Sequence, residues 1–327
     1  MLSFHAAGKD GIEVAMDAET IPSAVSWIDA ERPDSAEIAF LERTLKIEVP
    51  TLETLSEIET SSRLRSDKAW LYLSIPMIHR TDGFMPALTP LGFVLSKDVL
   101  LTVRFKHMKA FDDVLETISR CPAQAGGPGA LVVISEVIVG HAADVLESVG
   151  SDLDGLSEEI FGTNAANVRR HRPRDDGAQL RLVLRKVGRN GDLTSKIEDL
   201  LLGMARMVPY VAAYAAPYLE AGIRAKLKSL QRDIASLNDY ETHLTDKIHF
   251  LLDATLGLTN IDQNNIFRIL TVVSVIGIPP TFFASIWGMN FKNIHEYDWT
   301  YGYEFGLFII AVSALIPIIW FKWRGWW

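Results

Sequence analysis

Two apolar segments near the C-terminus constrain this 327-residue chain more than any other feature. Residues 269–291 contain no charged side chain, and this length is close to the ~20 residues that a helix needs to cross a bilayer. A second uncharged run covers residues 305–321. Because the link between them is short, two spanning helices would form a hairpin whose outer ends lie on the same side of the membrane.

The charges beside the two segments predict how this hairpin is oriented. Lys322 and Arg324 follow the second segment without an acid, whereas the link carries Glu296 and Asp298 against the base Lys292. Basic residues accumulate on the cytoplasmic side of membrane proteins. We therefore expect a two-span protein of the inner (plasma) membrane, with both termini in the cytoplasm and the link at residues 292–303 outside.

The N-terminal part of the chain, residues 1–125, is predicted to form a cytosolic α/β domain. Runs rich in β-branched and large apolar residues predict strands at residues 69–75, 91–95 and 99–103, with a turn at Ser96-Lys97-Asp98. Amphipathic patterns predict helices at residues 35–45 and 108–119. The glycine-rich stretch at residues 123–129 predicts a linker after this domain.

The pattern then becomes helical as far as the membrane. Residues 130–216 are predicted to be a helical hairpin region, with one helix at residues 131–161 and another at residues 179–214, interrupted near Asn190-Gly191. Pro217 starts a third helix, and no proline follows until Pro279.

This third helix defines the predicted architecture. Residues 217–268 would form a long stalk helix that continues into a first membrane helix at residues 269–291. A second, shorter membrane helix is expected at residues 304–322, followed by a basic, aromatic tail at residues 323–327. The continuous helix would be about 100 Å long at ~1.5 Å per residue. A helix of this length needs neighbours, which are either the preceding helices or other subunits.

A polar stripe follows the long helix when its sequence is written in heptads. The two series that form the stripe are Asp239, Asp246, Asp253, Asn260, Phe267, Ser274, Thr281 and Gly288, and His243, Phe250, Gly257, Asn264, Thr271, Ile278 and Ser285. Polar groups at membrane depth face protein or water rather than lipid. Several copies of the stripe could surround an aqueous path. Alternatively, the hydroxyls only allow close helix packing, and the aspartates form a solvated outer face.

Short motifs accompany the two apolar segments, namely Pro279-Pro280-Thr281, Gly288-Met289-Asn290-Phe291, Tyr301-Gly302-Tyr303 and the basic tail with its tryptophans. In this arrangement, residues 225–327 resemble the CorA family of magnesium channels. The resemblance implies a homopentameric funnel in the lipid bilayer, in which an α/β domain is joined to a stalk helix continuous with the pore helix.

The resemblance also implies roles for individual residues. Asn290 is similar to the pore-mouth asparagine that meets the hydrated cation, and Gly288 and Met289 complete that selectivity motif. The remaining expected pore-lining residues are Asn264 as a polar ring, Phe267 (or Leu270) and Ile278 as apolar constrictions, Thr281 in the upper pore, and the stripe residues Thr271, Ser274 and Ser285. Glu296, with Asp298, would form the outer acidic loop.

The implied function is passive, gated uptake of divalent cations, chiefly Mg²⁺ and also Co²⁺ or Ni²⁺. Mg²⁺ sheds water reluctantly, so a ring of neutral amide and carbonyl oxygens suits a cation that enters with its water shell. Mg²⁺ bound in the cytosol would also close the channel. The acids available on the stalk for this regulatory ion are Asp233, Asp239, Glu241, Asp246 and Asp253. The four aspartates are the candidate ligands, and a solvated surface acid is the alternative.

Several other functions are not expected. The formal net charge of −9 argues against nucleic acid as a partner. The chain has no GxxxxGK[ST] loop for a nucleotide and no nucleophile motif, so an enzyme is not expected. Two alternatives stay open. One is a zinc-transporting member of the same family; such members typically have another residue in place of the motif methionine, so Met289 argues against it. The other is a membrane-anchored sensor or scaffold that conducts no ions.

Overall fold

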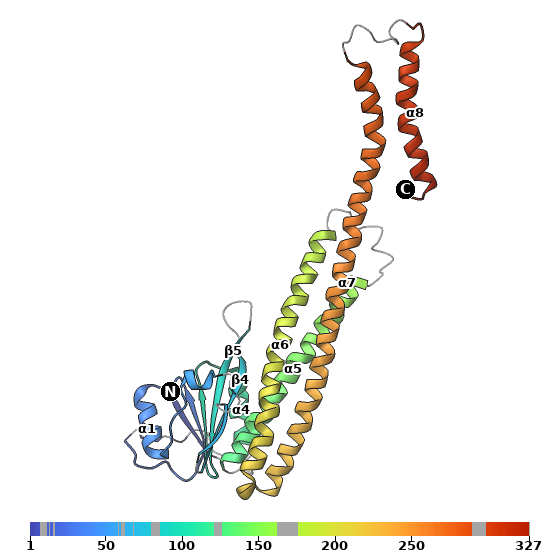
Figure 1. The fold of residues 1–327 in the computed structure, drawn as a ribbon. Coiled ribbons are helices and arrows are strands. Elements are labelled where there is room, and N and C mark those ends of the chain that lie inside the picture. Colours follow the sequence, from blue (N-terminus) through green and yellow to red (C-terminus); the bar gives the residue numbers. More distant parts are fainter. Residues whose placement is uncertain are drawn as a thin grey trace. The chain divides into compact units, whose positions relative to one another are not determined.

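The computed structural model describes residues 1–6, 12, 14–15, 17–57, 59, 63–67, 69–79, 86–120, 126–161, 176–289 and 299–326. The chain divides into two compact units. The first comprises Met1–Pro173 and Arg181–Leu252, and the second comprises Arg174–Leu180 and Asp253–Trp327. Figure 1 shows the sheet and the long helices of the first unit and the helical hairpin of the second.

A six-stranded sheet, in the order β1-β2-β6-β5-β4-β3, organises the first unit. Its strands are β1 (Leu2–Ala6), β2 (Val25–Glu31), β3 (Leu64–Asp67), β4 (Trp70–His79), β5 (Ala87–Leu95) and β6 (Leu100–Arg104). β2 and β6 pair in parallel, and the other neighbours pair antiparallel. The strands expected at residues 69–75, 91–95 and 99–103 are present as β4, β5 and β6, whereas β1, β2 and β3 were not located from the sequence.

The two faces of the sheet bury two different cores, because successive side chains of a strand point to opposite faces. In β4, Leu71, Leu73 and Ile75 belong to one core, and Tyr72 between them belongs to the other. The core that holds Tyr72 includes residues of α1 (Ser35–Leu45) and α2 (Leu52–Leu55). The core on the opposite face continues into α4 (Lys109–Arg120), α5 (Gly127–Phe161), α6 (Asp176–Tyr214) and α7 (Ala221–Trp287).

Local signals account for some of these boundaries. Asp34 caps α1 by accepting a hydrogen bond from the Glu37 backbone, while the Glu37 side chain accepts one from the Asp34 backbone. This reciprocal capping box satisfies two N–H groups that a helix start otherwise leaves unpaired. The helix expected at residues 35–45 is confirmed, and the one expected at 108–119 is confirmed within one residue at each end.

Two expected interruptions are wrong. Gly127 starts α5 rather than lying in a linker, and a β-carbon there would be 2.6 Å from the Val99 carbonyl carbon. α6 passes through Asn190-Gly191 without a break. A β-carbon on Gly191 would lie 3.7 Å from Cγ2 of Ile248, which is an ordinary van der Waals distance. Gly127 therefore serves a close backbone approach, whereas Gly191 is simply accommodated inside α6, and local sequence cannot distinguish either case from a turn.

The first part of α7 packs into the first unit along a regular seam. A short 3₁₀ turn, η1 (Ala216–Tyr218), holds Pro217, so α7 starts at Ala221 rather than at residue 217. Its buried residues alternate in steps of four and three, apart from half-buried Leu237, and are Ile223, Leu227, Leu230, Ile234, Glu241, Leu244, Ile248 and Leu251. This spacing is the heptad seam of helices that pack side by side.

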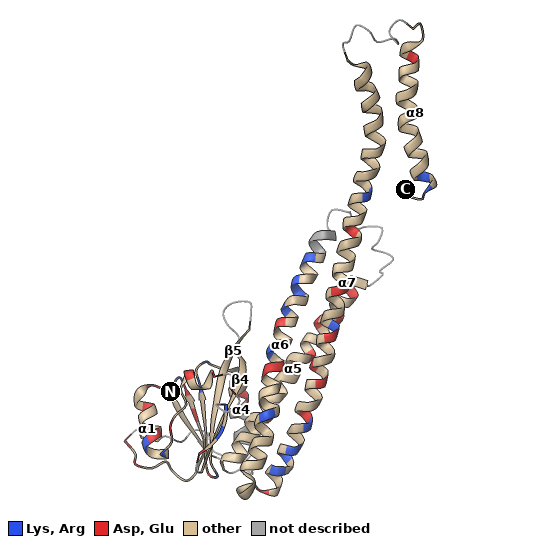
Figure 2. Ribbon diagram, in the orientation of Figure 1, with Lys and Arg blue, Asp and Glu red and all other residues tan. Residues whose placement is uncertain are grey.

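The second unit is built from the rest of α7 and from α8 (Gly302–Trp323), which run antiparallel beside one another (Figure 1). A β-carbon on Gly306 of α8 would lie 3.6 Å from the Trp287 ring of α7. Val272 and Phe321 are buried. Figure 2 shows that charged residues are frequent along the helices of the first unit and almost absent from α8 and the end of α7.

Candidate functional site

Three helices are long and apolar enough to cross a membrane, by length and composition, within the described ranges: α5, α7 and α8. They differ in what covers them. The most apolar window of α5 is 61% buried inside the chain, whereas those of α7 and α8 are 6% and 11% buried. The apolar surface of α5 is therefore buried in the core of the first unit. Most of the apolar surface of α7 and α8 is not covered by the described parts of the chain.

The polar stripe of α7 lies away from the chain's own packing. Its residues in the apolar part of the helix are exposed, apart from half-buried Ser274, and even the large side chains Phe267 and Ile278 are 65% and 64% exposed. Asn264, Thr271, Thr281 and Ser285 are exposed as well. The stripe is therefore available for contact with water, lipid or further copies of the chain.

Three hydroxyl groups of the stripe, those of Thr271, Thr281 and Ser285, bond to their own helix. Thr271 donates to the Phe267 carbonyl oxygen at 2.7 Å, and Ser285 donates to that of Thr281 at 2.7 Å. Thr281 is within hydrogen-bond reach of the carbonyl oxygens of Gly277 (3.0 Å) and Ile278 (2.8 Å). Each proton has a partner even without water, while the hydroxyl oxygen can still accept a bond. These contacts fit both a water-lined path and a packed interface.

Two prolines leave backbone carbonyl groups of the same segment without their usual hydrogen-bond donors. Pro279 and Pro280 lie inside α7 and have no N–H to donate. The carbonyl groups one turn earlier, on Val275 and Ile276, therefore lose their usual helical donors. In a membrane, such carbonyl groups are tolerated where protein or water satisfies them. The segment thus combines hydroxyl and carbonyl oxygens on an otherwise apolar helix.

The glycine and methionine of the Gly288-Met289-Asn290 motif lie at the end of α7. The Gly288 N–H donates to the Ala284 carbonyl at 2.9 Å, and the Met289 N–H donates to that of Ile286 at 3.3 Å, so the last turn tightens. Met289 is exposed. Asn290, Glu296 and Asp298 lie outside the described residues, and their roles stay predictions.

Comparison with known proteins decides the family. The chain matches the model of the CorA-like Mg²⁺ transporter protein family over residues 22–323. The chain belongs to this family. It is 29% identical to the magnesium transport protein CorA of Wolinella succinogenes over 312 residues, which covers 93% of this chain and 92% of the relative. It is also 29% identical to CorA of Pasteurella multocida over 302 residues, covering 92% and 91% of the two chains.

A solved structure agrees with the fold. The complete CorA magnesium transporter from Methanocaldococcus jannaschii matches with a TM-score of 0.73 at 21% identity, covering 92% of this chain and 91% of that one. The expected CorA fold, an α/β domain followed by long helices and a C-terminal helix, is confirmed. As a CorA family member the protein is a channel or transporter rather than an enzyme, as the sequence indicated.

The acids expected to hold a regulatory ion do not meet within one chain of this CorA protein. Asp233, Asp239, Asp246 and Asp253 are all exposed on α7. Successive members of the last three are seven residues apart, about 10 Å along a helix. Over the residues described, no group of three or more His, Cys, Asp or Glu side chains is close enough to hold a metal ion.

Two buried polar features of the CorA first unit go beyond the sequence predictions: the Asp29–Arg104 pair was not identified from the sequence, and Glu241 was counted only among the acids available on the stalk. Arg104 on β6 forms a two-pronged ion pair with Asp29 on β2, with an Nη2 to Oδ2 distance of 2.8 Å, and it also reaches Glu31 at 2.7 Å. Glu241 lies in the heptad seam of α7 and is 4% exposed. The heptad spacing of α7 is the sequence signal that indicates the burial of Glu241. No local sequence signal indicates the pairing of β2 with β6, which brings Asp29 next to Arg104.

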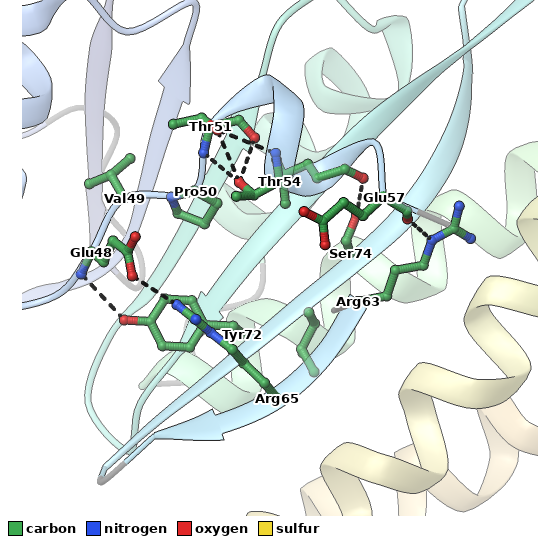
Figure 3. A pocket seen from close by; sticks show the side chains of 12 residues that line it. Glu48, Val49, Pro50, Thr51, Thr54, Glu57, Arg63, Arg65, Tyr72 and Ser74 are labelled. Atoms are coloured by element: carbon green, nitrogen blue, oxygen red, sulfur yellow. Dashed lines mark hydrogen bonds and ion pairs between the residues drawn. The ribbon is translucent and has the colours of Figure 1, made fainter. Parts of the chain in front are cut away.

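The first unit also contains a cavity of about 340 Å³ beside α2 and β4 (Figure 3). Arg65 pairs with Glu48 at 3.2 Å and lies 4.4 Å above the Tyr72 ring. Arg63 donates to the Glu57 carbonyl at 2.8 Å. The wall of the cavity carries the acids Glu48 and Glu57 and the bases Arg63 and Arg65. The cavity therefore lacks the excess negative charge of a cation site.

Proposed function

We propose that this CorA family protein conducts divalent cations, chiefly Mg²⁺, through a membrane pore formed by several copies of α7. The observation that carries the proposal is the uncovered stripe of Asn, Thr and Ser residues on an apolar helix that ends in Gly288-Met289. A helix that only anchored a domain would need no such stripe. The magnesium transport proteins named above support Mg²⁺ as the main cation.

The proposed assembly is a homopentamer in the inner membrane, as the family resemblance implies. Residues 269–291 and 304–322 would span the bilayer, with residues 292–303 outside and both termini in the cytoplasm. Residues 1–125, 130–216 and 217–268 would form the cytosolic domain, the helical hairpin and the stalk. Copies of the stripe would then face one another around a shared axis, which accounts for its exposure in a single chain.

The pore would act on Mg²⁺ together with its water shell. A ring of Asn290 amides at the outer mouth can hydrogen-bond to that shell without the tight binding of a charged ring. Glu296 and Asp298 on the link would raise the local cation concentration. The inside-negative potential drives uptake by about 2.3 kcal/mol per charge per 100 mV, and twice that for Mg²⁺. Co²⁺ and Ni²⁺ would follow the same path.

Closure would come from Mg²⁺ bound between cytosolic parts of neighbouring copies. The candidate ligands on the stalk are Asp233, Asp239, Asp246 and Asp253, each requiring partners from another chain. An ion can shift a conformational equilibrium only if it binds one state more tightly. Bound Mg²⁺ would therefore have to favour the closed arrangement of the stalks.

The test is cation flux into proteoliposomes that contain the purified full-length protein. Wild type is compared with Asn290→Ala and Asn264→Ala, with Mg²⁺, Co²⁺, Ni²⁺ and Zn²⁺ measured in parallel. Asn265→Ala is the matched control, since Asn265 follows Asn264 directly but lies off the stripe. We expect Mg²⁺ flux in wild type and the control, a loss in Asn290→Ala, and altered flux in Asn264→Ala.

Each other outcome has a defined meaning. Flux of Zn²⁺ alone would assign the protein to zinc transport. Absence of flux for all four cations, even at low internal Mg²⁺, would favour an anchored sensor. An equal effect of Asn264→Ala and Asn265→Ala would contradict the pore-lining role of the stripe.

A further inference from the structure

Three basic side chains lie at one level of the α7–α8 hairpin in the second unit. The register of the hairpin follows from the approach of Gly306 on α8 to the Trp287 ring on α7. Arg268 lies nineteen residues before Trp287 on α7. Gly325 lies nineteen residues after Gly306, just beyond the end of α8. Because the helices are antiparallel, these two positions are level, and Figure 2 shows basic residues on both helices toward the end of the hairpin that holds the C-terminus. The bases at this level are Arg268, Lys322 and Arg324.

The same register places two buried side chains one turn inside the level of the bases. Val272 on α7 and Phe321 on α8 are 5% and 3% exposed. Each lies fifteen residues from the residue of its own helix that sets the register, so the two are level with one another. Arg268 comes four residues before Val272, and Arg324 comes three residues after Phe321. Residues three or four apart share a helix face, so both arginines lie on the adjoining sides of α7 and α8.

A turn at the end of α8 folds the tail back onto the helix. Gly325 has a φ of +70°, and its N–H donates to the Lys322 carbonyl oxygen at 3.3 Å. The Trp326 N–H donates to the Phe321 carbonyl oxygen at 3.0 Å. These two bonds around a left-handed glycine are the Schellman motif. The Trp326 ring also stacks on the buried Phe321 ring, with centroids 5.5 Å apart. The bases of the tail are therefore held in a defined place beside α7.

The three bases have no acidic side chain as a partner within the described residues, and all three are exposed. Arg324 lies 5.7 Å from the centroid of the Trp320 ring, a contact that leaves its charge uncompensated. The nearest described acid along α7 is Asp262, six residues before Arg268, and the acid of α8, Glu304, lies at the opposite end of that helix. Three positive charges therefore gather where the described chain supplies no acidic side chain.

The depth of this level matches the headgroup region of a bilayer. Arg268 is about 28 Å from Trp287 along α7 at ~1.5 Å per residue, close to the ~30 Å thickness of the hydrocarbon core. Trp320 and Trp323, beside the bases, are 46% and 84% exposed, and tryptophan is enriched at membrane interfaces. Basic pockets between membrane helices on the cytoplasmic side bind anionic headgroups, and a guanidinium group bonds to phosphate through two N–H groups. The exposed apolar surface next to the bases suits acyl chains, which a free anion lacks.

We propose that Arg268, Lys322 and Arg324 form a binding site for the phosphate group of one anionic phospholipid of the inner leaflet. The headgroup bridges the ends of α7 and α8, and its acyl chains lie along the exposed apolar surface of the hairpin. The bound lipid supplies the negative charge that the described chain lacks at this level. The placement in the inner leaflet rests on the membrane orientation given under the proposed function, whereas the binding of the lipid does not depend on conduction.

The test is native mass spectrometry of the full-length protein in detergent, with dioleoyl phosphatidylglycerol or dioleoyl phosphatidylcholine added. We expect one tightly bound phosphatidylglycerol per chain and much weaker binding of phosphatidylcholine. Arg268→Gln and Arg324→Gln should each weaken phosphatidylglycerol binding about fivefold, the effect of one base near an anionic surface. Arg268→Lys keeps the charge and should bind this lipid more tightly than Arg268→Gln. Lys228→Gln removes an exposed base from α7 in the first unit and is the matched control, which should bind as wild type does.

Four results would overturn the lipid site. These are equal binding of the two lipids by wild type, unchanged phosphatidylglycerol binding in the two glutamine variants, an equal loss in Lys228→Gln, and displacement of the lipid by inorganic phosphate at equal concentration, which would assign the bases to a free anion. If Arg268→Gln and Arg324→Gln each removed a different bound lipid, the single shared site would be wrong. Mg²⁺ flux into proteoliposomes is measured separately. Absence of flux contradicts the proposed function alone, because lipid binding is measured without transport.

Discussion

The two halves of α7 share one helical backbone but have opposite surroundings. Within residues 221–252, a side chain is buried at nearly every third or fourth position, from Ile223 to Leu251. Within residues 253–287, only Thr255 and Val272 are buried, although this half is the more apolar one. Apolar residues are thus most exposed where they are most frequent, which is the reverse of a water-soluble protein.

This contrast separates two sources of stability. The first half is stabilised by removing its own apolar seam from water against α5 and α6. Among the described residues the second half has no comparable seam, which leaves its apolar surface available to lipid or to other copies. Figure 2 shows the same division in charge, since Asp, Glu, Lys and Arg residues are frequent in the first half and nearly absent from the end of the second.

The largest expected effect tests whether the first unit depends on its own buried contacts. Arg104→Ala leaves the Asp29 carboxylate buried without its partner, so it should lower the free energy of unfolding by about 3–5 kcal/mol. Denaturant unfolding of the full-length protein measures the loss. Arg65→Ala removes an ion pair between exposed side chains and should cost less than about 1 kcal/mol. Similar losses of unfolding free energy in the two variants would contradict the view that the first unit depends on the buried Asp29–Arg104 pair.

A pair of leucines compares the two halves of the helix directly. Leu251 is 0% exposed and Leu256 is 46% exposed, only five residues further along α7. Leu251→Ala should cost about 2–5 kcal/mol, because it leaves a cavity in a packed seam. Leu256→Ala should cost much less in the same unfolding experiment in detergent. An equal cost would show that another copy covers Leu256 in the assembled protein.

Thr281 tests whether the exposed stripe has a role in transport rather than in stability. Its hydroxyl bonds to carbonyl groups of its own helix, so Thr281→Val should change stability by only about 0.5 kcal/mol. If the hydroxyl oxygen contacts water in the pore, Mg²⁺ flux in proteoliposomes should fall severalfold. Thr281→Ser keeps the hydroxyl and serves as the control. Unchanged flux in Thr281→Val would favour the packing interpretation of the stripe.

The smallest expected effect concerns the surface of the first half. Lys247 pairs with Asp154, whose side chain is largely exposed. Lys247→Ala should therefore cost less than about 1 kcal/mol, and the cost should shrink further at high salt. Unfolding at low and high ionic strength measures this difference. A larger, salt-independent loss would indicate that Lys247 contributes to the seam through packing of its aliphatic chain.

Local patterns predicted part of this molecule correctly. The α1 boundaries were predictable because the Asp34 and Glu37 capping box lies within four consecutive residues. The apolar helices were predictable because length and hydrophobicity are read along the chain, although the same criterion also admits α5. The regular stripe of α7 followed from heptad spacing, and its exposure in the chain agrees with that reading.

Long-range contacts account for what was missed. The parallel pairing of β2 with β6 joins residues about 75 positions apart, and no nearby turn signals it. Gly127 and Gly191 resemble breaks in sequence, but each lies inside a helix, and Gly127 closely approaches the Val99 backbone. The burial of Glu241 likewise depends on which face of α7 meets α5 and α6.

By itself, the sequence of this CorA protein determined the apolar helices, the continuity of the stalk and the positions of the polar stripe. Each of these depends on periodicity or composition within one segment. Only the tertiary structure decided which apolar helix is covered by the chain and which is left exposed. It also decided that an acid lies in the seam, because burial depends on neighbours that are distant in sequence.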